Sequence, residues 1–229
     1  MTPIAENLAR VRSEVASACS AAGRDDSDVR LLPVSKTHPV KNIGEAVLAG
    51  CIEFGENRVQ EMAAKADQLS GVSWVLIGHL QRNKAALACS VMSELQSLDS
   101  LKLASVLDRW YEENRPDERL KVLVEVNTSG ESSKSGVHPD SVIDFTASLR
   151  PYSHLDVQGL MTVAHPDPAL ADAGFSLMSD LQRSLQDRDG GGWHDLSMGM
   201  SADFVSAIVH GSTCVRIGAA IFGQRMVNN

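Results

Sequence analysis

Short runs of β-forming residues alternate with helical segments along almost the whole chain, and this rhythm restricts the fold more than any other feature. Strands that are separated by helical segments form right-handed units and a parallel sheet. Eight runs predict strands, at Leu31–Ser35, Cys51–Phe54, Ser73–Ile77, Val91–Leu95, Val122–Asn127, Asp156–Met161, Trp193–Ser197 and Thr213–Ile217. Eight such units predict an α/β fold, a (β/α)8 TIM barrel at the small end of its size range.

We predict a single domain over residues 1–229, with an additional N-terminal helix at 2–22 before a barrel at 29–223. Thr2 and Pro3 are typical of the cap and the first position of a helix. A doubly wound open sheet is the alternative architecture. The chain lacks both the glycine fingerprint of dinucleotide-binding sheets and the phosphate-binding P-loop motif, which favours the barrel.

Charge and cysteine usage narrow the classes of partner. Lysine and arginine number 21 against 29 acidic residues, a formal charge of −8, which argues against nucleic acid or an anionic membrane as the main partner. The four cysteines form no C-x-x-C pair, and the seven histidines show no metal-ligand spacing. No apolar run is long enough to span a membrane, and the N-terminus lacks a signal peptide, so we expect a cytoplasmic protein.

A lysine follows the first predicted strand directly. Alternation along that strand places Leu32, Val34 and Lys36 on one face, so an apolar inward row ends in an amine at the mouth of the barrel. Partial burial lowers the pKa of an amine and favours a Schiff-base lysine; a lysine that extends to solvent is the alternative. Pro33 lacks a ladder donor, which predicts a bulge or irregular pairing in this strand.

The loops after the seventh and eighth strands are typical of an anion site. We expect Ser201 to cap a helix that begins at Ala202, with Gly199 allowing close approach of the backbone to a ligand. Gly218 and Ala219 lead into a second short helical piece after the eighth strand. Barrels commonly bind phosphate at these two loops, whereas ordinary capping and turn formation is the alternative interpretation.

Arg216 is predicted to point into the barrel near the same mouth, where a guanidinium needs an acceptor. Glu125 on the fifth strand is one candidate, which would make an ordinary structural ion pair. The other candidate is a ligand acceptor such as the ring nitrogen of a pyridine. A reactive lysine, a phosphate cup and an arginine at one barrel mouth together describe a site for pyridoxal phosphate.

Several motifs in register resemble those of one known family. They are Val34–Thr37, Phe54–Glu61, Ile77–Gln81 with Asn83 and Lys84, Asn127 with Lys134–Gly136, Gly159–Thr162, Leu196–Asp203 and Val215–Gly218 with Ile221–Gly223. Over essentially its whole length the chain resembles the pyridoxal-phosphate homeostasis proteins, also called the proline synthetase co-transcribed family. The resemblance implies a fold type III barrel related to the alanine racemase N-terminal domain. The roles it implies are an internal aldimine at Lys36, phosphate contacts at Ser201, Gly218 and Ala219, a pyridine-nitrogen contact at Arg216 and ring contacts at Asn57 and Met198.

The same resemblance implies a protein that binds and delivers pyridoxal phosphate, keeps the free aldehyde low and affects amino-acid and keto-acid balance, without firm catalytic activity. The expected partners are the cofactor and, transiently, apo-enzymes that use it; we expect a monomer. The residues also favour a non-enzyme, because an arginine does not readily give the ring nitrogen a proton. Related racemases take a second acid/base, a tyrosine, from a further β-domain, and the printed sequence ends just after the eighth unit.

Two other functions remain open at this point. The first is a racemase-like enzyme that acts on amino acids, for which His79 is the best candidate acid, although a polar loop residue is the alternative interpretation. Tyr111 and Tyr152 are predicted to lie in a helix and at the opposite end of the barrel. The second is an interaction module in which the cofactor is only structural.

Overall fold

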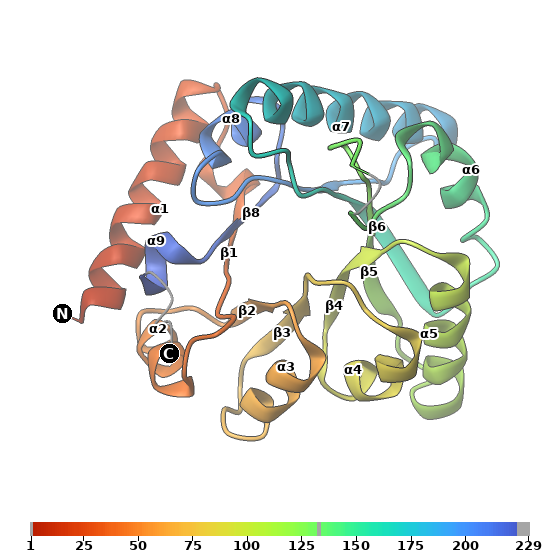
Figure 1. Ribbon diagram of the computed structural model, residues 1–229, viewed down its shortest axis with the longest axis horizontal. Helices are drawn as coiled ribbons and strands as arrows, with labels where there is room; N and C mark the ends of the chain where they lie inside the picture. The colour runs from red at the N-terminus through yellow and green to blue at the C-terminus, as the bar shows by residue number, and fades with distance from the viewer. Residues whose placement is uncertain (1, 132–133, 224–229) are drawn as a thin grey trace.

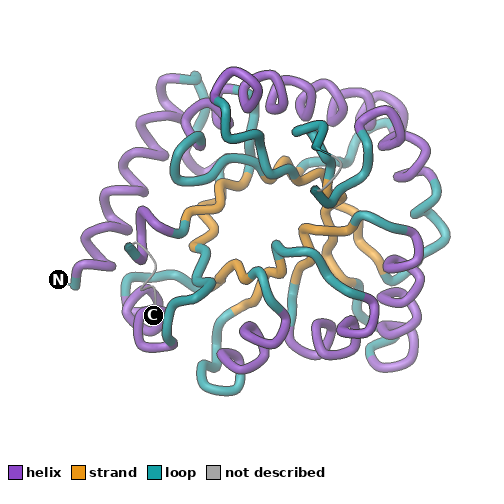
Figure 2. The backbone as a smooth tube through the Cα atoms, in the orientation of Figure 1, coloured by secondary structure: helices purple, strands orange, loops and turns teal. Residues whose placement is uncertain are grey.

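Eight parallel strands form one sheet that curves into a nearly closed barrel, and the helices surround it on the outside (Figures 1 and 2). The computed structural model describes residues 2–131 and 134–223. Residues 1, 132–133 and 224–229, which the predicted domain includes, lie outside the described residues. The strand order β1-β8-β7-β6-β5-β4-β3-β2 is that of a sheet closed on itself, so the prediction of a (β/α)8 barrel is confirmed.

All eight predicted strands are present. They are β1 (Arg30–Pro33), β2 (Glu53–Glu56), β3 (Ser73–Leu76), β4 (Glu94–Leu98), β5 (Leu120–Glu125), β6 (Leu155–Met161), β7 (Asp195–Ser197) and β8 (Cys214–Ile217). The helices are α1 (Pro3–Ala21), α2 (Val40–Leu48), α3 (Val59–Ala66), α4 (Ala85–Val91), α5 (Leu101–Asn114), α6 (Val142–Ala147), α7 (Pro168–Asp189), α8 (Phe204–Val209) and α9 (Ala219–Phe222). Short 3-10 turns occupy Asp26–Asp28, Arg82–Lys84 and Pro139–Ser141.

Helix α1 begins as its sequence predicts. The Thr2 hydroxyl accepts a hydrogen bond from the Ala5 N–H at 3.3 Å, and Pro3 occupies the first helical position. Its buried face, which includes Leu8, Val11 and Val15, packs against the main core. Figure 1 shows α1 beside α8 and α9, and α1 also contacts α2, so the N-terminal helix packs against the last two barrel units and the first helix after β1.

The fourth strand is displaced from its predicted position. The prediction placed it at Val91–Leu95, but Val91 ends α4 and the strand begins at Glu94. Glu94 and Gln96 are buried and hydrogen-bond to each other in the barrel interior. Strands are predicted from apolar residues at every second position. Because the inward positions of β4 are polar, this pattern is missing and the prediction placed the strand too early in the sequence.

The seam between β1 and β2 has little backbone pairing. Register between β1 and β8 runs without a shift from Arg30 to Pro33, so a bulge at Pro33 is not present on that side. The Val34 N–H bonds to Ile217 of β8 whereas the Ser35 N–H bonds to Gly55, and alternation therefore turns the Pro33 nitrogen toward β2. There the pairing is reduced to one bridge, Val34 with Gly55, so the predicted irregular pairing is present on this side.

Within the part of the chain that the structure describes, no helix has the length and apolar character needed to cross a membrane. All four cysteines are buried free thiols.

Gly159 tests the barrel packing, because a Cβ atom there would lie 1.8 Å from the backbone oxygen of Asp195 on β7. We expect Gly159→Ala to lower the free energy of unfolding by about 2 kcal/mol or more through forced separation of β6 and β7. Gly44→Ala in α2 is the matched control, since its Cβ would meet nothing within 4 Å. The control should raise stability by about 0.5–1 kcal/mol, and urea denaturation measures both. Equal effects of the two substitutions would contradict the packing argument.

Candidate functional site

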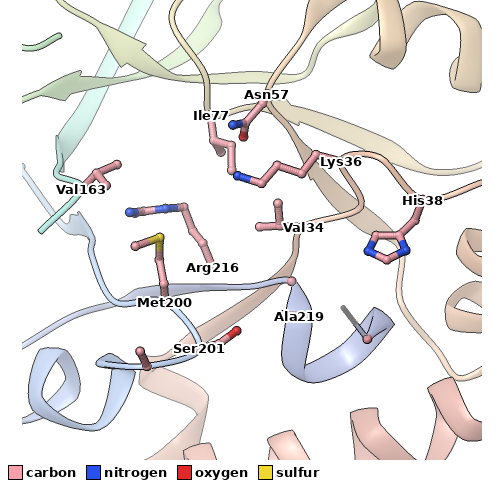
Figure 3. A pocket seen from close by; sticks show the side chains of 13 residues that line it. Val34, Lys36, His38, Asn57, Ile77, Val163, Met200, Ser201, Arg216 and Ala219 are labelled. Atoms are coloured by element: carbon pink, nitrogen blue, oxygen red, sulfur yellow. The ribbon is translucent and has the colours of Figure 1, made fainter. Parts of the chain in front are cut away.

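A cavity of about 410 Å³ opens at the carboxyl ends of the strands, where barrel sites are normally found. Six of the seven predicted site residues line it: Lys36, Asn57, Ser201, Arg216, Gly218 and Ala219. Figure 3 shows the Lys36 and Arg216 side chains directed into the same space, with Asn57 and Ile77 on one side and Ser201 and Ala219 on the other. The structure therefore brings together residues that lie as far as 183 positions apart in sequence, from Lys36 to Ala219 (219 − 36).

Arg216 is fixed by uncharged acceptors. Its guanidinium donates to Ser197 Oγ at 2.6 Å and to the Thr162 carbonyl at 2.7 Å. The residue is only 3% exposed, and burial lowers the pKa of its guanidinium while nearby charges, including Glu125, act in the opposite direction. An ion pair with Glu125 was one of the two interactions predicted for Arg216. Among the described residues this ion pair is absent.

A chain of hydrogen bonds runs through the barrel interior and ends at Arg216. At the amino-terminal end, Arg30 makes two 2.8 Å hydrogen bonds to the Glu94 carboxylate. The Gln96 amide donates to Glu94 at 2.7 Å, and its oxygen accepts from Ser197 Oγ at 2.8 Å. Because the Ser197 hydroxyl hydrogen is directed to Gln96, its lone pair faces Arg216. We call this series Arg30–Glu94–Gln96–Ser197–Arg216 the interior chain.

The loop after β7 differs from its predicted form. Helix α8 begins at Phe204, so Ser201 does not cap it and Ala202 lies in the preceding turn. The turn is closed by Asp203 instead, whose carboxylate accepts from the Met200 N–H at 2.6 Å. Gly199 has a φ of 95°, and a Cβ there would lie 2.9 Å from Phe204 Cα. The turn presents Met200, Ser201 and Ala202 to the cavity.

The short helix α9 forms the neighbouring wall and is held from outside by α1. Asn7 donates to the Ile221 carbonyl at 3.0 Å, and Arg10 donates to the Ala220 carbonyl at 3.0 Å. At the start of α9, a Cβ on Gly218 would lie 3.2 Å from the Val34 carbonyl, so glycine allows this turn to approach β1 closely. The first N–H groups of a helix have no partner within it and favour anions.

The structure separates Met198 from the other six predicted residues. Its side chain is fully buried in the main core, and Met200, two residues further on, lines the cavity. Sequence reasoning also missed Val163 as a lining residue and the contacts of Thr162 and Ser197 to Arg216. A polar residue at the carboxyl end of β7 is the signal that could have identified Ser197. Thr162 contacts Arg216 through its backbone carbonyl, which no side-chain pattern marks.

Glu125 lies in a smaller adjoining cavity of about 230 Å³, which shares Val163 with the first. Its Oε2 is buried without a hydrogen-bond partner among the described residues. Burial raises the pKa of this carboxyl from an ordinary 4.5 to about 7, and the charge of Asp99 adds to the shift. Glu125 is therefore a carboxyl that exchanges its proton near neutral pH.

The other candidate acids lie elsewhere. His79 Nδ1 lies 3.1 Å from Asp99 Oδ2, and both line a separate open cavity beyond β3 and β4. Tyr111 is buried on α5, and Tyr152 precedes β6 at the opposite end of the barrel, as predicted. In the described part of the chain no group of three His, Cys, Asp or Glu side chains could hold a metal ion.

Comparison with known proteins defines the class to which this barrel and its site belong. The model of the family described as "Alanine racemase, N-terminal domain" matches residues 6–226. A pyridoxal phosphate homeostasis protein of Pasteurella multocida is 40% identical, and the match covers 97% of each chain. One from Pseudomonas aeruginosa is 38% identical, with 98% of this chain and 97% of that protein covered. The chain belongs to the family of pyridoxal phosphate homeostasis proteins.

A solved structure supports the same assignment. PipY of Synechococcus elongatus, determined with pyridoxal phosphate (PLP) bound, superposes with a TM-score of 0.83 at 34% identity and covers 96% of this chain and 100% of that chain. The form without PLP gives a TM-score of 0.85 at the same identity and coverage. The fold described above is thus shared with a protein whose structure was solved with this cofactor bound.

Replacement of Glu125 tests the proton that this carboxyl carries. The folded protein retains a proton that the unfolded chain releases between pH 4.5 and about 7, so the free energy of unfolding of the unsubstituted protein falls as the pH rises through this window. Glu125→Gln has no such proton to lose. Near pH 4.5 the variant should be as stable as the unsubstituted protein. Near pH 7 its free energy of unfolding should be higher by up to about 3 kcal/mol. Urea denaturation across the window measures the difference, and parallel curves would contradict the shifted pKa.

Proposed function

We propose that this protein carries and buffers pyridoxal phosphate, bound through a Schiff base to Lys36, and so maintains the supply of the cofactor without turning over a substrate. The convergence of Lys36 and Arg216 on one cavity beside the Ser201 and Gly218 turns carries the proposal. A primary amine condenses with an aldehyde by forming a C=N bond and releasing water, and hydrolysis reverses the reaction. Reversibility is what a carrier needs. We place this role in the cytoplasm, with a monomeric protein.

The residues present fit this cofactor. The Ser201–Ala202 turn and the start of α9 at Gly218–Ala219 form one wall of the cavity and suit the phosphate. Lys36 enters from the turn after β1 and suits the aldehyde, while Asn57 and Ile77 line the cavity beside it. The cavity volume of about 410 Å³ lies in the range of small-molecule sites.

Arg216 supports a holding role over catalysis. Its hydrogen bonds to Ser197 and Thr162 orient the guanidinium toward the cavity without neutralising its charge. When bound, pyridoxal phosphate supplies an electron sink whose strength depends on protonation of its ring nitrogen. A guanidinium donates a hydrogen bond to that nitrogen but retains its own protons, because arginine side chains stay charged in proteins. Arg216 therefore binds and orients the ring, and provides little activation.

Lys36→Ala tests the covalent attachment. Loss of the amine should abolish the yellow absorption of the reconstituted protein and weaken binding by at least about 100-fold, since the bond exploits a high effective concentration of the amine. Lys41→Ala on α2 is the control, because Lys41 is an exposed lysine five residues away. Borohydride reduction followed by peptide mapping should find the label on Lys36. A label spread over surface lysines would contradict the proposal.

Transfer to an apo-aminotransferase separates carrying from catalysis. The loaded protein should restore activity to the apo-enzyme faster than it releases free cofactor to an added trap. In parallel, amino acids in deuterated water should gain no α-deuterium from the loaded protein. Lys36-dependent deuterium incorporation would instead support the racemase-like alternative, and permanent retention of the cofactor in the presence of apo-enzyme would contradict a carrier.

A further inference from the structure

A buried charge cluster lies directly behind the peptide that bears Lys36. The Lys65 ammonium, on α3, is within 2.6 Å of Glu56 Oε1 and 2.7 Å of Glu61 Oε1. It also donates to the Ser35 carbonyl at 2.8 Å. Lys65 is 6% exposed, and Glu56 and Ser35 are fully buried, so water has little access to the contacts of Lys65 with these two residues. The Glu61 side chain is 25% exposed.

The cluster binds the residues on both sides of Lys36. On the preceding side, Ser35 is bound twice, through its carbonyl to Lys65 and through its hydroxyl to Glu56 Oε1 at 2.6 Å. On the following side, the Thr37 N–H donates to Glu61 Oε1 at 2.5 Å. Lys36, between these two neighbours, lines the cavity.

The backbone conformation of Thr37 shows why these hydrogen bonds are needed. Its φ is 67°, in the left-handed region that β-branched residues rarely adopt. A strained residue of this kind persists only where its surroundings hold it. The carboxylate of Glu61 binds its N–H, and Lys65 fixes that carboxylate in turn.

The cluster also lies at the seam of the barrel. Between β1 and β2 the ladder consists of the Val34–Gly55 bridge and the Ser35 N–H to Gly55 bond. The hydroxyl of Ser35 and the carboxylate of Glu56 add a side-chain link across the same gap. Asn57, which lines the cavity, directly follows Glu56 on β2.

We propose that Lys65 is a positioning residue for Lys36: with Glu56 and Glu61 it fixes the peptides on both sides so that the Lys36 amine enters the cavity in a reactive orientation. This inference rests on the proposed function, in which Lys36 forms the bond to the cofactor. Lys65 does not touch the cofactor. Its effect is confined to the bond that Lys36 makes, and the phosphate wall is left unaltered.

Two ligands distinguish this role from general support of the fold. Pyridoxal phosphate needs a correctly placed amine, whereas pyridoxine 5′-phosphate carries an alcohol instead of the aldehyde and binds without any bond to Lys36. Lys65→Met should slow formation of the Lys36 adduct at least about tenfold, because displacement of a reacting group by about 1 Å can cost 100-fold. Affinity for pyridoxine phosphate should be unchanged. Stopped-flow absorbance measures the rate of adduct formation, and calorimetry measures the affinity for pyridoxine phosphate.

Matched variants control for the loss of a cation that binds a backbone carbonyl and a carboxylate. Arg188→Met removes another cation that binds a backbone carbonyl, that of Ile143, and a neighbouring carboxylate, Asp189, far from the cavity. It should leave both ligands unaffected. Lys65→Arg should restore part of the rate, since it keeps the positive charge and the donors. Should Lys65→Met not fold, Lys65→Met combined with Glu56→Gln removes opposite charges together and takes its place.

Each result has one meaning. A slow adduct with normal pyridoxine phosphate binding supports the positioning role. Equal rates in Lys65→Met and the unsubstituted protein overturn it while leaving the proposed function intact, and parallel loss of both ligands shows a merely structural role and also overturns it. If the unsubstituted protein forms no adduct on Lys36, the proposed function and this inference fall together.

Discussion

The ion pair between Arg30 and Glu94, at the amino-terminal end of the barrel, sets the orientation of the side chains that lead to Arg216 at the other end. Burial alone would raise the pKa of Glu94, but the hydrogen bonds and charge of Arg30 outweigh it and keep the pKa below its ordinary value. An ionised Glu94 can only accept, so Gln96 must present its amide to Glu94 and its oxygen to Ser197. The interior chain thereby delivers a lone pair to Arg216. A buried polar row is costly unless every member is paired, and this one is paired along its length.

The two cations of the cavity are thus supported from opposite faces of the same sheet. Arg216 is oriented from inside the barrel through Ser197, and the Lys36 peptide is held from outside by Lys65 on α3. The outer support lies where Pro33 leaves the β1–β2 ladder almost unpaired. In a fully paired seam the backbone at Thr37 would have less freedom to take a positive φ, so weak pairing and the turn that presents Lys36 belong together.

Sequence alone predicted the features that depend on local pattern. Strand periodicity and strand order bring Lys36 and Arg216 to one mouth, and the cap at Thr2 defines the first helix. The pattern failed where local and tertiary preferences differ. The polar inward residues of β4 hide its alternation, and the turn closed by Asp203 moves the start of α8 to Phe204. Apart from the Glu61–Lys65 pair on α3 and the Glu94–Gln96 pair on β4, the contacts of the Lys65 cluster and the interior chain join different strands and helices, and no local spacing encodes them.

Charge also explains how an acidic protein can favour an anionic ligand. The chain has a formal charge of −8, and salt screens the charges that are exposed on the surface within about 8–10 Å. Arg216 lies in the cavity wall at 3% exposure and donates to uncharged acceptors, so salt screens its charge little and neither of these acceptors neutralises it. Over the short distances of the cavity, this local cation outweighs the distant acidic surface. The surface excess then disfavours extended polyanions, which cannot enter the cavity, while a small phosphate ester can.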